Sequence, residues 1–187
     1  MTCASPKTAA NHLAHIRRIS RWMVWACTGL ICVLPMALVF YWATTSAPDL
    51  AQQGNLQSSA IQAPLQDWQR WAGGAVTAVP LAMLLVGVWQ ARRCFAQFAR
   101  GQVFTTQATD HLRRFAGWVA AAALAAIVAG AATSVLLTLH NPPGMRHLAV
   151  GIGSSHVLTL FFAGLVWLMA DIIGQGLTLA EENERFV

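Results

Sequence analysis

Charged residues are scarce in this chain. Of its 187 residues only 10% are Asp, Glu, Lys or Arg, and 56% are hydrophobic, whereas about a quarter of the residues of a soluble domain are charged. No Lys or Arg falls inside four hydrophobic stretches, residues 22–42, 71–91, 115–139 and 148–173. These absences exclude an ordinary soluble domain. They predict a single domain, residues 1–187, that lies in a lipid bilayer.

Patterns typical of disulfide frameworks, metal centres and catalytic sites are also missing. The four cysteines show no CxxC spacing, and His12 and His15 have no third ligand at a suitable spacing. Asp171 and His156 are about four helical turns apart and cannot meet. We therefore expect no enzymatic activity, no catalytic residues, no cofactor and no metal. The net charge of +5 sits in short clusters beside the apolar stretches, so no direct contact with nucleic acid is expected.

The four hydrophobic stretches are long enough to cross a membrane. A helix needs about 20 apolar residues to span the hydrocarbon core, because each backbone polar group must be paired inside its own helix. The sequence therefore predicts an all-α, polytopic membrane protein with a bundle of four transmembrane helices.

Basic residues lie mostly on one side of these spans. Ten Lys and Arg residues precede the first span, separate the second from the third or follow the fourth, and only Arg70 and Arg146 fall on the other side. Since Lys and Arg in short loops remain in the cytoplasm, this predicts an inner (plasma) membrane protein with both termini cytoplasmic. Tryptophans near the span ends, Trp42 among them, are expected at the membrane interfaces.

Two connections carry local signals. The tight Asn-Pro-Pro-Gly turn at residues 141–144 predicts adjacent, antiparallel third and fourth spans. Between the second and third spans, Gly101 is expected to end one helix, and Thr105 or Thr106 to cap the next.

The sequence Gln-Phe-Ala-Arg-Gly-Gln-Val-Phe-Thr at residues 97–105, running into Leu-Arg-Arg-Phe-Ala-Gly-Trp at 112–118, resembles a motif of a bacterial four-helix membrane family, domain of unknown function 2975. The ending Leu-Ala-Glu-Glu-Asn-Glu-Arg-Phe-Val at 179–187 is similar to that of the same family, and the resemblance covers about residues 20–187. It implies four spans and no established activity. It also implies a partner class, because some members are encoded beside small helix-turn-helix regulators.

Oppositely charged residues flank the expected cytoplasmic face. An acidic tail that folds back on the basic connection between the second and third spans would form a weak latch, because exposed charge pairs are individually weak. One interpretation is a connection anchored in lipid with a solvated tail, and the other is a docking site for a cytoplasmic partner. The residues concerned are Arg92, Arg93, Arg100, Arg113 and Arg114, with Glu181, Glu182 and Glu184.

Polar residues within the spans are costly and indicate interior contacts. His156, Ser155 and Thr159 of the fourth span are expected level with Thr133 and Ser134 of the third, in the outer half of the membrane. They form either an interhelical hydrogen-bond network or a site for a ligand or proton. Small residues at four-residue spacing on the third and fourth spans are expected to face each other. They are Ala122, Ala126, Gly130 and Ser134 on the third span and Gly151, Ser155, Thr159 and Ala163 on the fourth.

Three functional hypotheses remain. The first is a non-enzymatic sensor or regulatory membrane protein that holds a cytoplasmic, helix-turn-helix regulator at the basic connection or acidic tail. The second is an oligomeric channel or small-solute transporter built around Pro35, Pro80 and the His156 cluster, because proline-broken helices line transporter sites. The third is a structural subunit of a larger complex.

Overall fold

Five helices make up the computed structural model, which describes residues 6–53, 56, 66–102, 105–142 and 148–184. They are α1 (Pro6–Thr44), α2 (Ala47–Gln53), α3 (Asp67–Ala99), α4 (Thr106–Thr138) and α5 (Ser154–Glu184). All but α2 are long and apolar enough to cross a membrane. The predicted all-α fold with four long apolar helices is confirmed, and the chain is a multi-pass membrane protein.

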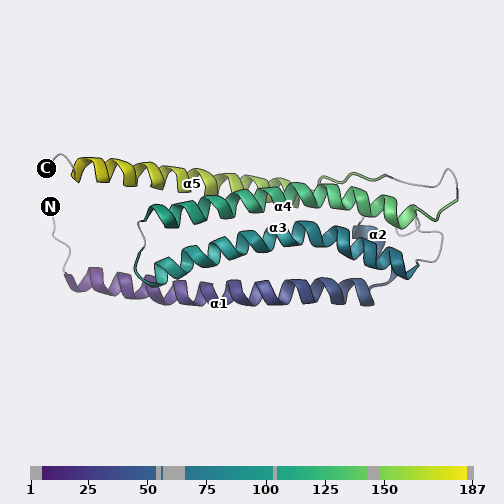
Figure 1. Cartoon of the computed structure of the whole chain (residues 1–187), viewed down its shortest axis with the longest axis horizontal. Helices are drawn as coiled ribbons and strands as arrows, with labels where there is room; N and C mark the ends of the chain where they lie inside the picture. The colour runs from purple at the N-terminus through teal and green to yellow at the C-terminus, as the bar shows by residue number, and fades with distance from the viewer. Residues whose placement is uncertain (1–5, 54–55, 57–65, 103–104, 143–147, 185–187) are drawn as a thin grey trace.

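The four long helices pack in a single row, in chain order (Figure 1). α3 packs between α1 and α4, and α5 packs on the other side of α4. α1 and α5 are therefore the two edges of the row, and the predicted adjacency of the last two spans is confirmed. One cavity is lined by α1, α3, α4 and residues near the start of α5, so the row is curved and has a concave side.

The connection between α3 and α4, residues 100–105, is called here the elbow. Gly101 has φ of +85°, a conformation that glycine adopts without steric cost. Its N–H donates to the carbonyl of Phe98, and the N–H of Gln102 donates to that of Gln97, which together close the last turn of α3. The Thr105 hydroxyl then accepts from the N–H of Ala108 at 3.3 Å. Both predictions, the stop at Gly101 and the Thr105 cap, are confirmed.

The opposite end of the row is closed by α2. Leu50 and Ala51 of this short helix are fully buried against Trp42 of α1 and Leu137 of α4. Gln69, near the start of α3, is also buried, and its Nε2 donates to the carbonyl of Leu136 at 2.9 Å. These contacts tie α1, α3 and α4 together at this end, which we call the α2 end.

α5 begins at Ser154, so the predicted start of the fourth span at Leu148 is wrong. Residues 148–153 are not helical. Gly151 and Gly153 lower the helix propensity of this segment, because glycine is about 1 kcal/mol less favourable than alanine within a helix, although Gly174 and Gly176, at the same spacing, remain helical in α5. The Gly153 carbonyl accepts the first hydrogen bonds of α5, from the N–H groups of His156 and Val157.

The surface along the helices is apolar, as lipid contact requires. Seven of the eight tryptophans expose large parts of their rings: Trp22, Trp25, Trp68, Trp71, Trp89, Trp118 and Trp167. Trp42 is the exception, because only 2% of it is exposed. The prediction that Trp42 lies at the membrane interface is therefore wrong. Its ring is buried against α3, where Gly73 and Gly74 leave room for it.

Candidate functional site

A groove of about 590 Å³ lies on the concave side of the row, toward the α2 end. Residues of α1 form one wall, α3 and α4 form the floor, and Gly151 and His156 stand on the far side. Gln52 of α2 lines its end. The lining is mostly apolar and is completed by Leu34, Ala37, Leu38, Tyr41, Trp42, Thr77, Pro80, Leu81, Ala126, Ala129 and Gly130.

His156 stands where this groove meets a second cavity. The second cavity, of about 300 Å³, lies between α3, α4 and α5, and Pro80, Leu81 and Ala126 line both spaces together with His156. The Nδ1 atom of His156 is buried and has no hydrogen-bond partner among the described residues. Leaving a buried polar atom unpaired costs about 1–3 kcal/mol. Among the described residues that line the groove, His156 is therefore the one with a buried polar atom that lacks a hydrogen-bond partner.

The segment before α5 carries His156 deep into the row. Figure 1 shows residues 148–153 running along α4 as a stretched connection, and such a chain covers up to about 3.3–3.6 Å per residue, against 1.5 Å in a helix. His156 consequently lies beside Ala122 and Ala126, in the middle part of α4. We expected His156 at the same depth as Thr133, in the outer half of the membrane. That prediction is wrong by about two helical turns.

The five residues of the predicted polar cluster are therefore divided between two places. Ser155 and Thr159 line the smaller cavity beside His156, and the Thr159 hydroxyl donates to the carbonyl of Ser155. Thr133 and Ser134 are fully buried nearer the end of α4. The Ser134 hydroxyl donates to the Ala131 carbonyl and accepts from the backbone N–H of residue 149 at 3.0 Å, which secures the stretched segment.

The Thr133 hydroxyl, like Nδ1 of His156, is buried and has no hydrogen-bond partner among the described residues. The expected facing of the small-residue stripes is found in part, because Ala122 and Ala126 of α4 line one cavity together with Ser155 and Thr159 of α5. Ala163, the last residue of the predicted α5 stripe, is buried, as is Ala170, whereas Ser155 and Thr159 are exposed. Helical spacing counted from Gly151 does not apply, because α5 starts only at Ser154.

Pro80 and Thr77 line the α3 side of the groove. Proline has no N–H, so the carbonyl one turn earlier, at residue 76, receives no helical hydrogen bond from it. The Thr77 hydroxyl, also on the groove, donates to the carbonyl of Gly73 at 2.9 Å and accepts from the indole of Trp42 at 2.9 Å. This part of the groove is therefore polar but internally paired.

The elbow end carries the arginines that the sequence singled out. The guanidinium of Arg92 donates to the Thr28 hydroxyl at 2.9 Å, and Arg92 and Arg93 both lie over the Trp89 ring, 5.1 and 5.7 Å from its centre. Arg100 and Arg114 are exposed. Arg17 of α1 also reaches the elbow, because its guanidinium lies against Gly101.

The structure places Asp171 of α5 against one of these arginines. Its carboxylate lies 3.3 Å from Arg113, which also sits over the Trp167 ring at 5.8 Å. Within the described side chains this is the one ion pair found. Glu182 is exposed, and the side chains of Glu181 and Glu184 lie outside the description. This pair is not among the contacts expected from the sequence, although Asp171 follows Trp167 by one helical turn at the end of a span.

No group of three or more His, Cys, Asp or Glu side chains that could hold a metal is found in the described part of the chain. A third cavity, about 280 Å³, opens between α4 and α5 at the elbow end, beside Asp110, Arg113 and Asp171.

Comparison with known proteins supports the family but gives no activity. Residues 54–187 match the family described as protein of unknown function (DUF2975). The match covers α3, α4 and α5 and leaves α1 and α2 outside it. No curated protein and no solved structure matches the chain.

Proposed function

Since the chain belongs to the DUF2975 family of unknown function, we propose its role from the geometry: a non-enzymatic regulatory membrane protein that holds an acidic, soluble partner at its elbow end. In this proposal the elbow end faces the cytoplasm of a bacterial inner membrane, as the ten-to-two distribution of Lys and Arg favours.

The observation that carries the proposal is the excess of unpaired positive charge at that end. Arginines from three helices gather there, and among the described side chains only Arg113 has a carboxylate partner. Asp110, Asp171 and Glu182 are the described acids nearby, too few to balance them. The arginines are Arg17, Arg18, Arg21, Arg92, Arg93, Arg100, Arg113 and Arg114.

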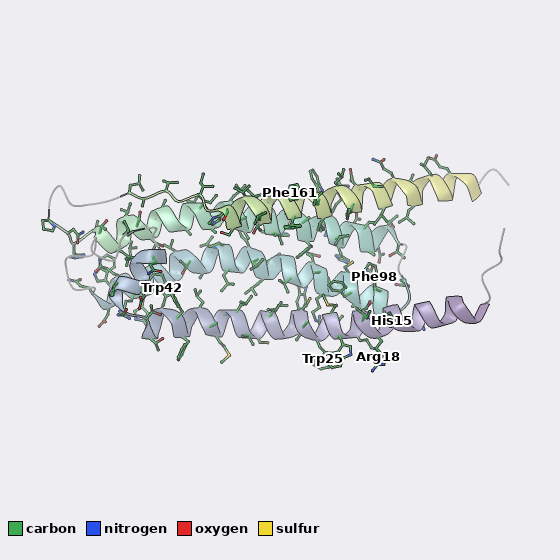
Figure 2. The ribbon with its side chains drawn as sticks, turned by 180° about the vertical axis from the view of Figure 1, so that it is seen from behind. His15, Arg18, Trp25, Trp42, Phe98 and Phe161 are labelled. Carbon is green, nitrogen blue, oxygen red and sulfur yellow. The ribbon has the colours of Figure 1, made fainter. Side chains whose placement is uncertain are left out.

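The shape of the elbow end supports the same role. The start of α1 and the end of α5 project beyond the elbow on opposite edges of the row (Figure 1). Arg18 and Trp25 point outward from the α1 edge, whereas Phe98 marks the end of α3 between the projecting helices (Figure 2). A soluble protein can therefore contact the arginines of α3 and α4 while it is flanked by two helices.

Surface charge pairs are individually weak, about 0–1 kcal/mol each, and they are screened over about 8–10 Å at physiological salt. Partner binding at such a surface should therefore depend on several arginines and on salt. The acidic tail, Glu181, Glu182 and Glu184, would compete with the partner for the same arginines.

The test is co-purification of soluble proteins with the full chain in nanodiscs, at low and high salt. Arg100→Gln combined with Arg114→Gln should lower partner recovery, as should added salt, whereas the triple Glu→Gln tail variant should raise it. Arg146→Gln, in the connection between α4 and α5, is the matched control and should have no effect. Identical partner sets in all variants, or no partner at all, would remove this proposal.

A channel or small-solute transporter remains the second candidate. The broken start of α5 favours it, because non-helical backbone at membrane depth is tolerated where it is buried in protein or lines a cavity, and Gly151 lines the groove. Against it, the elbow half between α1 and α3 is filled by Cys27, Val88 and Ala91 with Phe95 and Phe115 packed on them. A path through the membrane would need a second copy of the chain. Solute flux into proteoliposomes, absent from empty liposomes, would favour this candidate.

A further inference from the structure

The groove at His156 is independent of the elbow arginines, and it has the features of a small-molecule site. Its two neighbouring spaces, which share Pro80, Leu81, Ala126 and His156 in their linings, measure about 590 and 300 Å³, within the range of about 300–1,000 Å³ typical of ligand pockets. Such pockets are mostly apolar and hold a few polar groups that orient the ligand, which is the composition found here.

The polar group in question is the Nδ1 atom of His156. It is buried at the middle depth of the row and lacks a hydrogen-bond partner within the described residues. Neutral histidine has one ring nitrogen that donates and one that accepts, so either tautomer leaves Nδ1 with an unused capacity. As the ring stands, Nδ1 faces the chain near Gly153, but the His156 side chain lines both cavities. A half-turn of the ring about its second side-chain torsion would bring this nitrogen to a ligand atom in the groove.

The charge of the lining residues restricts the chemical class of ligand that the groove can bind. The described residues that line the two spaces include no Asp, Glu, Lys or Arg. A phosphate, carboxylate or ammonium group would therefore enter low-dielectric surroundings without a counter-ion, at a cost of several kcal/mol. A hydroxyl group avoids this cost and can donate or accept, so it suits both tautomers of His156.

The apolar walls of the groove indicate that the rest of the ligand is apolar. Leu34, Ala37 and Leu38 of α1 and Leu81 of α3 present an apolar surface next to His156, and the concave side is not covered by packing between α1 and α5. A molecule dissolved in the bilayer can therefore reach the groove along the membrane plane.

We propose that the groove binds an uncharged amphiphile with a hydroxyl head group, which hydrogen-bonds to the turned imidazole of His156 while its apolar body lies between α1 and α3. The proposal does not depend on the regulatory role of the elbow end.

The experiment uses the full chain in phosphatidylcholine nanodiscs and three photoreactive probes of equal chain length: dodecanol, dodecane and dodecanoate. Dodecanol should label α3 and α4 near Leu81 and Ala126, and unlabelled dodecanol should compete with it. Dodecane should label lipid-facing residues such as Phe161, which projects from the α5 edge (Figure 2), and dodecanoate should not compete.

Variants identify the role of the histidine. His156→Leu should weaken competition by about tenfold, as loss of one hydrogen bond to a buried group predicts, and His156→Gln should restore it. His140→Leu, outside the two cavities, is the matched control and should bind as the original chain does. If His156→Leu fails to fold, Ala126→Phe, which fills the junction, should abolish groove labelling.

Three outcomes would overturn the proposal. Dodecane labelling and competing at Leu81 and Ala126 as well as dodecanol would show an ordinary acyl-chain contact. Undiminished competition in folded His156→Leu would show that the imidazole does not bind the head group. Retained groove labelling in Ala126→Phe would place the ligand elsewhere.

Discussion

The indole nitrogen of Trp42 donates a hydrogen bond of 2.9 Å to the hydroxyl of Thr77, which joins the end of α1 to the α3 floor of the groove. Both residues are buried, and the Trp42 ring also packs over Gly73 and Gly74. This contact connects the two helices that form the groove at the α2 end, so its loss should loosen the groove as well as the fold.

Thr77→Val keeps the shape of the side chain but leaves the buried indole N–H without its acceptor. We expect a loss of about 0.6–1.7 kcal/mol, the range for interhelical hydrogen bonds in membranes, measured by thermal unfolding in detergent. Thr77→Ser retains the hydroxyl and should lose less. If Trp42→Phe and Thr77→Val destabilise additively when combined, the two side chains are not coupled.

Gly73 and Gly74 allow a matched pair of substitutions. A methyl group at Gly73 would overlap the six-membered ring of Trp42, whereas one at Gly74 would meet the ring at 3.4 Å, an ordinary contact. Gly73→Ala should therefore destabilise the protein by about 1–3 kcal/mol, as overpacking does, and Gly74→Ala should cost much less. Equal melting temperatures for both variants would contradict the burial of Trp42 against α3.

The Arg113–Asp171 pair should contribute little to stability. Its side chains are 49% and 44% exposed, and exposed ion pairs are typically worth about 0–1 kcal/mol. A double-mutant cycle with Arg113→Gln and Asp171→Asn should give a coupling energy in this range that falls as salt is added. A coupling well above it, insensitive to salt, would mean that the pair is shielded from water by lipid or by a partner.

Cysteine labelling with a membrane-impermeant reagent tests the orientation of the chain in the membrane. In a background without the four native cysteines, a cysteine at Gln107, beside the elbow, should react with a membrane-impermeant reagent only after permeabilisation. One at His140, at the α2 end, should react from outside, because Lys and Arg favour the cytoplasmic side by ten to two. The reverse labelling pattern would invert the proposed topology.

Local sequence determined the features whose physical causes are local. Four apolar stretches without Lys or Arg become four long helices, because in lipid a helix satisfies its own backbone. Gly101 ends α3 and Thr105 caps α4, since each acts on neighbouring backbone groups. The membrane character of the chain and its family could be predicted from such signals.

Tertiary structure decided where the polar side chains lie. The sequence could not show that residues 148–153 leave the helix and carry His156 about two turns deeper than helical spacing predicts. Nor could it show that Trp42 turns from the lipid interface onto Gly73, or that Asp171 meets Arg113. These outcomes depend on the distances between helices and on which faces meet, and those are determined by the packing of the whole row rather than by any one segment.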